Sequence, residues 1–316
     1  MLVDIFATAI LPIVAVATVG FVLGRARGTD PGPLNTAVVY VLAPALVLHS
    51  LATTTLSAET LLGVAAAVVA FVLGMSAVAE AVGRVLGYDT PARSALVLVA
   101  AFSNSGNYGI PVSAFAFGDV GRSTAVLYLG VQSVLMYTVG VYVAARSAGG
   151  GGLAGVKRVF RIPLVYAVAA ALLARWLGVV PAATATSMRT LQLVGDASIP
   201  VMLLILGIQL ANSDYGAAVS RTVTPTVLKM AVAPALAAAV AVAVGFGTAD
   251  VARVYVLECA MPAAVTPLIL SVEFANDAEI GGVAVPEFVG ATIFVTTLVS
   301  VPVLTVLVFA LQSAPL

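Results

Sequence analysis

The sequence predicts an all-α membrane protein in which ten transmembrane helices form two inverted five-helix repeats. Three features lead to this prediction: the composition, a series of apolar runs, and a basic glycine-rich segment near the middle of the chain. Of the 316 residues, 61% are hydrophobic and only 9% are charged. A water-soluble domain cannot bury so large an apolar fraction, so the chain is expected to cross a lipid bilayer several times.

The apolar runs define the individual spans, because Gly, Pro and charged residues interrupt them at intervals suited to membrane helices. The first run follows Asp4 without an early Lys or Arg and without a cleavage site. It is therefore predicted to be a membrane helix and not a removed signal peptide. The ten predicted spans lie near residues 5–24, 34–55, 61–83, 94–118, 122–145, 162–180, 186–211, 223–246, 251–274 and 283–311.

The longest connection, from Arg146 to Arg161, separates the two predicted repeats. It contains four consecutive glycines followed by two basic residues, which is typical of a flexible basic linker. We expect residues 1–148 to form the first repeat, residues 149–161 the linker, and residues 162–316 the second repeat. An odd number of spans in each half gives the two copies opposite orientations in the membrane.

The distribution of basic residues predicts the orientation. Nine Arg and Lys side chains lie beside the loops that follow odd-numbered spans, and four lie beside the opposite loops. Positively charged loops tend to remain in the cytoplasm. The odd-numbered loops, including the basic linker, are therefore expected inside the cell and both termini outside it, with the plasma membrane as the location.

Polar and helix-breaking residues interrupt the fourth span. Between Asn104 and Pro111 the chain reads NSGNYGIP. Proline removes a backbone donor, and glycine lowers the cost of unwinding a helix. Broken backbone at membrane depth is tolerated only where it is buried in protein or lines a cavity. The stretch is therefore predicted to be a binding site within a broken helix; the alternative is a kinked packing helix with a seam of small residues.

A second break is predicted in the ninth span, at Pro262 and Pro267. Pro267 lies 156 positions after Pro111, and Pro200 lies the same 156 positions after Pro44. The two interrupted spans thus occupy corresponding positions in the two halves. Such a pair is the sequence pattern expected of a transport site at a repeat interface.

Three motifs occur in order along the chain: NSGNYGIP at 104–111, GDASIP at 195–200 followed by LGIQL at 206–210, and AMPA at 260–263. In this order they resemble the motifs of the auxin efflux carrier family, which includes plant PIN-type carriers and prokaryotic homologues. The resemblance implies a scaffold domain and a transport domain in which broken helices 4 and 9 cross. This architecture is shared with the bile acid/sodium symporter superfamily. It also implies alternating access to a small organic anion, an auxin-like or malonate- or malate-like carboxylate.

The predicted substrate site lies at the two breaks. Asn104 and Asn107 are the leading candidates, because their amide N–H groups can donate to a carboxylate without a buried fixed charge. Alternatively, these amides only satisfy backbone groups that the break sets free. The other candidates for shaping or lining the site are Ser105, Tyr108, Pro111, Met261 and Pro262.

Three carboxylates are candidates for binding a proton or a coupling cation, because ionisable groups within a membrane are functional candidates. Asp196 lies within the seventh span and could instead satisfy polar groups at the proline kink. Glu258 lies beside the second break and could instead pair with Arg253. Glu80 lies near the cytoplasmic end of the third span and could equally be an interface residue.

The remaining residue types narrow the possible cofactors. One Cys and one His exclude a disulfide framework and a Cys/His metal cluster. We therefore expect no metal and no other cofactor, with Na⁺ or H⁺ coupling left open. His49 is predicted to be a hydrogen-bonded packing residue, with a proton switch as the alternative. Lys229 is predicted to snorkel toward the cytoplasmic side of the membrane; the alternative is a lysine that faces the cavity and attracts an anion.

The favoured function is secondary transport of an organic anion. The alternatives are a Na⁺-coupled symporter of the bile acid type, and a channel or receptor that binds solute without moving it. An enzyme is not expected, because the sequence has no HExxH, no paired-Asp motif and no nucleophile with a base. The net charge of zero argues against a nucleic-acid partner. The expected partners are the anion and the lipid bilayer, with a homodimer left open.

Overall fold

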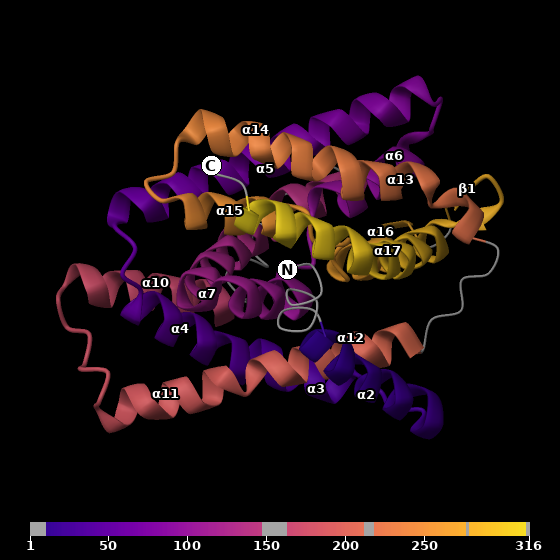
Figure 1. Ribbon diagram of the computed structural model, residues 1–316. Coiled ribbons are helices and arrows are strands. Elements are labelled where there is room, and N and C mark those ends of the chain that lie inside the picture. Colours follow the sequence, from indigo (N-terminus) through magenta and orange to yellow (C-terminus); the bar gives the residue numbers. More distant parts are fainter. Residues whose placement is uncertain (1–10, 147–162, 212–217, 276–277, 314–316) are drawn as a thin grey trace.

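The computed structural model describes residues 11–146, 163–211, 218–275 and 278–313 (Figure 1). The helices before the linker are α2 (Leu11–Arg27), α3 (Gly32–Ala37), α4 (Ala43–Thr53), α5 (Ala58–Val85), α6 (Thr90–Ala101), α7 (Ile110–Leu135) and α8 (Val141–Ala145). Those after it are α10 (Pro163–Trp176), α11 (Thr186–Asp196), α12 (Ser198–Ala211), α13 (Val223–Val227), α14 (Ala233–Val244), α15 (Ala249–Cys259), α16 (Thr266–Ala275) and α17 (Val285–Ser313). Several helices are joined by π-helical turns, η2 (Val38–Leu42), η3 (Ser105–Gly109), η4 (Met136–Gly140) and η7 (Leu228–Val232), and a 3₁₀ turn, η6 (Val219–Arg221), precedes α13.

The helices pack as two groups. We call α2, α3, α4, α10, α11 and α12 the α4 group, and α5 to α8 with α13 to α17 the α5 group. Figure 1 shows α2, α3, α4, α11 and α12 along one side of the molecule and α5, α6, α13 and α14 along the other. Within the α4 group, α2 crosses α12 in close contact. A Cβ atom at Gly20 would lie 2.2 Å from the Leu204 carbonyl oxygen, and one at Gly207 would lie 1.8 Å from that of Ala17. Small residues at such positions let membrane helices approach backbone to backbone.

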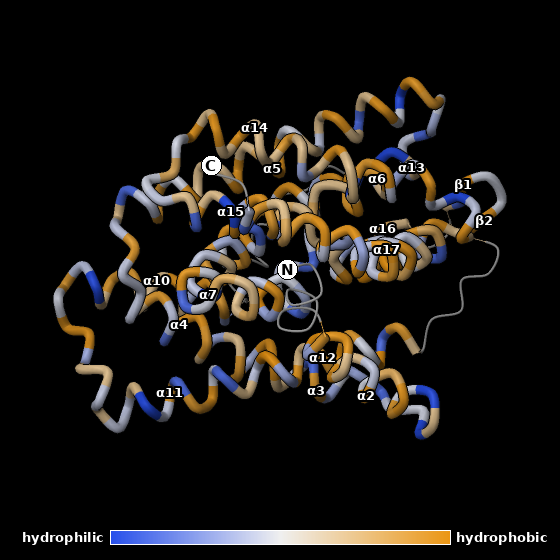
Figure 2. Tube along the Cα trace, viewed as in Figure 1, coloured by the Kyte–Doolittle hydropathy of each residue, from blue (hydrophilic) through white to orange (hydrophobic). Residues whose placement is uncertain are grey.

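The outside of the molecule is apolar. In Figure 2, hydrophobic residues run along α5, α14 and α17. The side chains of Leu62, Val242 and Trp176 are 72%, 78% and 81% exposed, which lipid tolerates and water does not. The helices long and apolar enough to cross a membrane, among the described residues, number six: Gly32–Thr53, Ala58–Val85, Ser105–Ala145, Thr186–Ala211, Val223–Val244 and Val285–Ser313. The chain is therefore a multi-pass membrane protein, and the count of ten spans stays a prediction.

The fourth and fifth predicted spans are connected by helix and not by a loop. The chain is helical up to Ala101, resumes at Ser105, and continues through η3, α7, η4 and α8 to Ala145. A kink divides this long element at Gly118, where φ is +60°. Glycine adopts this left-handed backbone without a Cβ clash. The sequence correctly predicts a boundary between two spans near this glycine. It does not show that the chain is helical on both sides of the boundary.

A short hairpin precedes α17. Strand β1 (Glu279–Ile280) pairs antiparallel with β2 (Val283–Ala284), with Glu279 opposite Ala284. The two residues between the strands, Gly281 and Gly282, have φ of +58° and +80°, as a tight hairpin turn requires. The sequence shows only a gap between the ninth and tenth predicted spans here, because strands of two residues are too short to show an alternating pattern.

Candidate functional site

The two predicted breaks lie against each other at the centre of the α5 group. α6 ends at Ala101 and α15 ends at Cys259, and in each case a non-helical stretch precedes the next helix. Ser103 of the first break pairs antiparallel with Ala263 of the second. The backbone N–H of Asn104 donates to the Pro262 carbonyl at 2.8 Å. The N–H of Ala264 donates to the Phe102 carbonyl at 3.0 Å. The ninth span is therefore broken beside the fourth, as the sequence predicts.

Proline explains where the chain becomes helical again. α7 begins at Ile110, directly before Pro111, and α16 begins at Thr266, directly before Pro267. Proline is favoured in the first turn of a helix, where its missing N–H costs nothing. The two helix starts have the same spacing of 156 residues as the prolines. We call the region where these four half-helices meet, residues 102–109 and 260–265, the crossover.

Lys229 of η7 is buried at the crossover and does not snorkel, so this prediction is wrong. Its side chain is fully buried. The ammonium Nζ donates to Ser103 Oγ at 2.7 Å, to the Cys259 carbonyl at 3.2 Å and to the Ala100 carbonyl at 3.3 Å. It also lies 5.6 Å from the centre of the Phe71 ring. The carbonyls belong to the last turns of α6 and α15, where a helix dipole is negative, so the ammonium stabilises both helix ends at once.

Gln132 of α7 is a second buried residue that the sequence does not single out. Its Nε2 donates to the Ser103 carbonyl and to Ser105 Oγ, each at 2.8 Å. Its Oε1 accepts from the Ser103 N–H at 3.0 Å. The side-chain amide thereby satisfies both backbone groups that the break exposes at Ser103. A glutamine within an apolar span is the only sign of this role in the sequence.

The predicted residues of the first break differ in burial and in hydrogen bonding. Asn104 is 6% exposed, and none of the described residues forms a hydrogen bond with its amide nitrogen Nδ2. Asn107 is half-buried on η3. The hydroxyls of Ser105 and Tyr108 are engaged within the protein, by Gln132 and by Ser300 at 3.3 Å. Among the described residues of the first break, the buried side-chain atom that lacks a hydrogen-bond partner is Nδ2 of Asn104.

The predicted residues of the second break lie on the other side of the crossover from Asn104. Met261 and Pro262 are both buried, and the Pro262 carbonyl accepts the bond from Asn104. Beyond Val265, the last residue of the second break, a cavity of about 270 Å³ lies between α12 of the α4 group and α16 and α17 of the α5 group. Its lining is mostly apolar, with Gln209 and Thr297 as polar members. A small solute could reach the second break through this cavity.

Glu258 also lies at the crossover, and it does not pair with Arg253. The Arg253 side chain bonds Asp250 at 2.9 Å, within α15. Glu258 is fully buried and accepts a 2.6 Å hydrogen bond from the Ser113 hydroxyl of α7. Of the candidate carboxylates, it is the one that the structure brings to the crossover.

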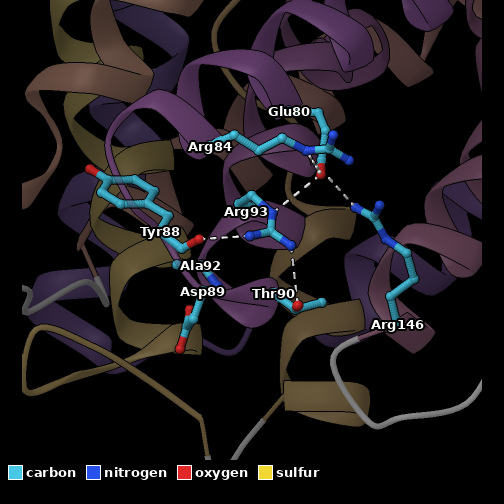
Figure 3. Close-up of polar contacts among 8 residues, drawn as sticks. All are labelled: Glu80, Arg84, Tyr88, Asp89, Thr90, Ala92, Arg93 and Arg146. Carbon is cyan, nitrogen blue, oxygen red and sulfur yellow. Dashed lines mark hydrogen bonds and ion pairs between the residues drawn. The ribbon is translucent and has the colours of Figure 1, made fainter.

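The other two candidate carboxylates lie in ion pairs elsewhere. Asp196 ends α11 and bonds Arg122 of α7 at 2.5 Å, with its side chain 43% exposed. His49 of α4 lies near this pair. Glu80 of α5 contacts three arginines, at 3.1 to 3.2 Å, as Figure 3 shows: Arg84, Arg93 and Arg146. For Glu80 these contacts agree with the interface alternative.

Comparison with known proteins agrees with this architecture. The model of a family described as membrane transport protein matches residues 5–154 and again residues 154–308. An uncharacterized transporter of Methanothermobacter thermautotrophicus is 27% identical over 296 residues, which cover 92% of this chain and 93% of that protein. The two successive matches meet at residue 154, within the predicted linker. The chain therefore belongs to the membrane transport protein family, to which the auxin efflux carriers belong, and is a transporter and not an enzyme.

Proposed function

We propose that this protein is a secondary transporter that binds a small organic anion at the crossover and moves it by alternating access. The observation that carries the proposal is the amide of Asn104, a buried hydrogen-bond donor that no group in the described part of the chain uses. Buried donors are nearly always satisfied, so an unused one at a helix break points to a ligand. A carboxylate offers the acceptor oxygens that such a donor requires.

The half-helix ends favour an anion over a cation on this side of the crossover. α7 with η3, and α16, both begin at the crossover, and the N-terminal end of a helix carries partial positive charge and free N–H groups. The negative ends of α6 and α15 are already satisfied by the Lys229 ammonium. Both arguments support a carboxylate near Asn104 and Asn107, with Met261 and Pro262 beside it.

The division into two helix groups supports alternating access. In this proposal the α4 group is the scaffold and the α5 group carries the crossover between the two sides of the membrane, as inverted repeats allow. The cavity beside Val265 lies between the groups. Residues 54–57 connect them, and the guanidinium of Arg175 donates to the Leu51, Thr54 and Leu56 carbonyls at this connection.

The proposal is tested by transport of labelled carboxylates into proteoliposomes. A thermal-shift screen of small carboxylates, with and without Na⁺, first identifies a ligand, because a ligand stabilises the state that it binds. Asn104→Ala should then lower the flux at subsaturating substrate about tenfold or more, the effect of losing one hydrogen bond to a charged group. Asn35→Ala, at an exposed asparagine of α3, is the matched control and should transport normally.

Two results would contradict the proposal. One is a well-folded wild-type protein that transports none of the carboxylates of the screen into proteoliposomes. The other is a demonstrated flux that Asn104→Ala leaves unchanged, which would remove the amide from the site. A flux that saturates with substrate concentration and shows counter-transport distinguishes a carrier from a channel.

A further inference from the structure

Glu258 of the second broken helix packs against the first broken helix. The residue lies one position before the end of α15, and its side chain is fully buried. Oε1 accepts the bond from Ser113 of α7, whereas Oε2 has no hydrogen-bond partner among the residues that the structure describes. Oε2 lies against Gly109, where a Cβ atom would be only 2.2 Å away. The carboxyl of one broken helix is therefore enclosed by the first turns of the other.

Among the described residues, no positively charged side chain pairs with this carboxyl. The adjacent Cys259 is buried, and the titratable side chains around it are Tyr128 of α7, Lys229 of η7 and Tyr255 of α15. Lys229 directs its ammonium to backbone carbonyls and to Ser103. Along the described part of the chain, no Arg or Lys forms an ion pair with Glu258. α14 has no titratable side chain, and the one acid of α17, Glu287, lies in its first turn.

An ionised carboxylate in this position is unfavourable for two separate reasons. Burial of a charge with a single neutral donor costs far more than burial of a neutral carboxyl group. In addition, Glu258 and the proposed anion beside Asn104 would be two negative charges at one crossover, and they would repel each other in a medium of low dielectric constant. A proton on Oε2 removes both costs.

We propose that Glu258 is a proton-binding site that couples proton movement to anion movement, so that one proton crosses the membrane with each anion. The proton binds from the solution on one side, as an O–H bond to Oε2, and is released to the solution on the other side. Binding is reciprocal: the proton raises the affinity for the anion, and the anion raises the affinity for the proton. The coupling rests on the proposed function, but the proton site itself does not.

Transport under an imposed pH gradient tests the coupling. The membrane potential is clamped, and a monocarboxylate identified by the screen is supplied on the acidic side of proteoliposomes. One unit of pH should drive about tenfold accumulation for one proton per anion; protein-free vesicles correct for passive entry of the undissociated acid. Glu258→Gln should lose this accumulation and retain anion exchange between equal pools. Glu279→Gln, at an exposed residue of β1, is the matched control and should accumulate normally.

Infrared spectroscopy tests the proton site without any substrate. During a pH titration of the wild-type protein, the carbonyl stretch of a protonated carboxyl group should be present and should be missing in Glu258→Gln. Ser113→Ala should shift the midpoint of that band, because it removes the hydrogen bond that Oε1 accepts. An unaltered band in Glu258→Gln, or full gradient-driven accumulation by that variant, overturns the proposal. If the band behaves as expected but no carboxylate is transported, the proposed function fails and the proton site stands.

Discussion

Two glycines three positions apart in the π-helical turn η3 have different surroundings. A Cβ atom at Gly109 would lie 2.2 Å from Glu258 Oε2, whereas one at Gly106 would be 3.6 Å from the nearest atom, Leu129 Cδ1. Gly109 has a helical φ of −63°, so its requirement for glycine is steric and not conformational. The missing side chain lets the carboxyl of the second broken helix pack directly on the first.

We therefore expect Gly109→Ala to destabilise the protein by about 1–3 kcal/mol, the usual effect of overpacking a dense interior. The thermal unfolding midpoint in detergent should fall by several degrees. Gly106→Ala is the control in the same turn and should leave the midpoint nearly unchanged. Equal midpoints for the two variants would show that Glu258 does not pack against Gly109.

The amide side chains at the crossover differ in how readily the sequence identifies them. Asn104 and Asn107 attract notice because amides are rare in apolar spans, and the structure places both at the crossover. Gln132 has the same chemistry but lies apart from any helix-breaking motif. Its role depends on a contact with Ser103 across 29 positions of the chain, which periodicity and propensity do not report.

At the scale of the helices, close packing between α2 and α12 depends on glycine. Gly207 would place a Cβ atom 1.8 Å from a carbonyl oxygen of α2, and Gly24 would place one 2.7 Å from the Ala211 side chain. Backbone atoms cannot move aside as a flexible side chain can. A larger residue at Gly207 must push α2 and α12 apart. This would disturb the packing of the α4 group.

Gly207→Ala should accordingly lower the thermal unfolding midpoint by several degrees, through loss of about 1–3 kcal/mol. Gly63→Ala, in α5, is the matched control, because its Cβ atom would lie 3.7 Å from Val244. Alanine is a better helix former than glycine, so this control should be neutral or slightly more stable. A neutral effect at Gly207 would mean that α2 and α12 do not cross at this distance.

Proline and glycine explain why the chain is broken after α6 and after α15. They do not explain why the two breaks lie against each other. The residues that pair, Ser103 and Ala263, are 160 positions apart and carry no complementary chemistry. Their backbones pair because each break leaves N–H and C=O groups that no water can satisfy at membrane depth. Each broken helix supplies the partners that the other one lacks.

At the scale of the whole molecule, orientation in the membrane is the prediction that matters most for the direction of transport. The charge distribution places the loop after α5 in the cytoplasm and the loop after α14 outside. Leu86 and Thr248 lie in these two loops, and both are exposed. The one native cysteine, Cys259, is buried, so it provides an unreactive background for labelling.

In intact cells, an impermeant thiol reagent should therefore label Thr248→Cys and not Leu86→Cys. Both should react once the membrane is permeabilised, which controls for accessibility. The reverse pattern would invert the orientation. Labelling of both from outside would contradict opposite placement of the two loops, and with it the predicted number of spans.

An ion pair also joins the two helix groups across the molecule. Arg122 of the α5 group and Asp196 of the α4 group are partly exposed, so the pair contributes little to stability, as is usual for solvated ion pairs. In an alternating-access cycle the two partners would have to separate. Asp196 attracts attention in the sequence as an acid within a span, but only its partner shows that it belongs to the surface between the groups.

The sequence by itself determined the membrane class, the positions of most helices, both breaks and the repeat, because hydrophobicity and the backbone limits of proline and glycine act locally. Only the tertiary structure decided that Lys229 lies at two helix ends, that Gln132 satisfies Ser103, and that Glu258 lies unpaired against Gly109. These contacts join residues distant in the chain. Their energies come from desolvation and from partners brought together by folding, and neither can be read from one residue and its neighbours.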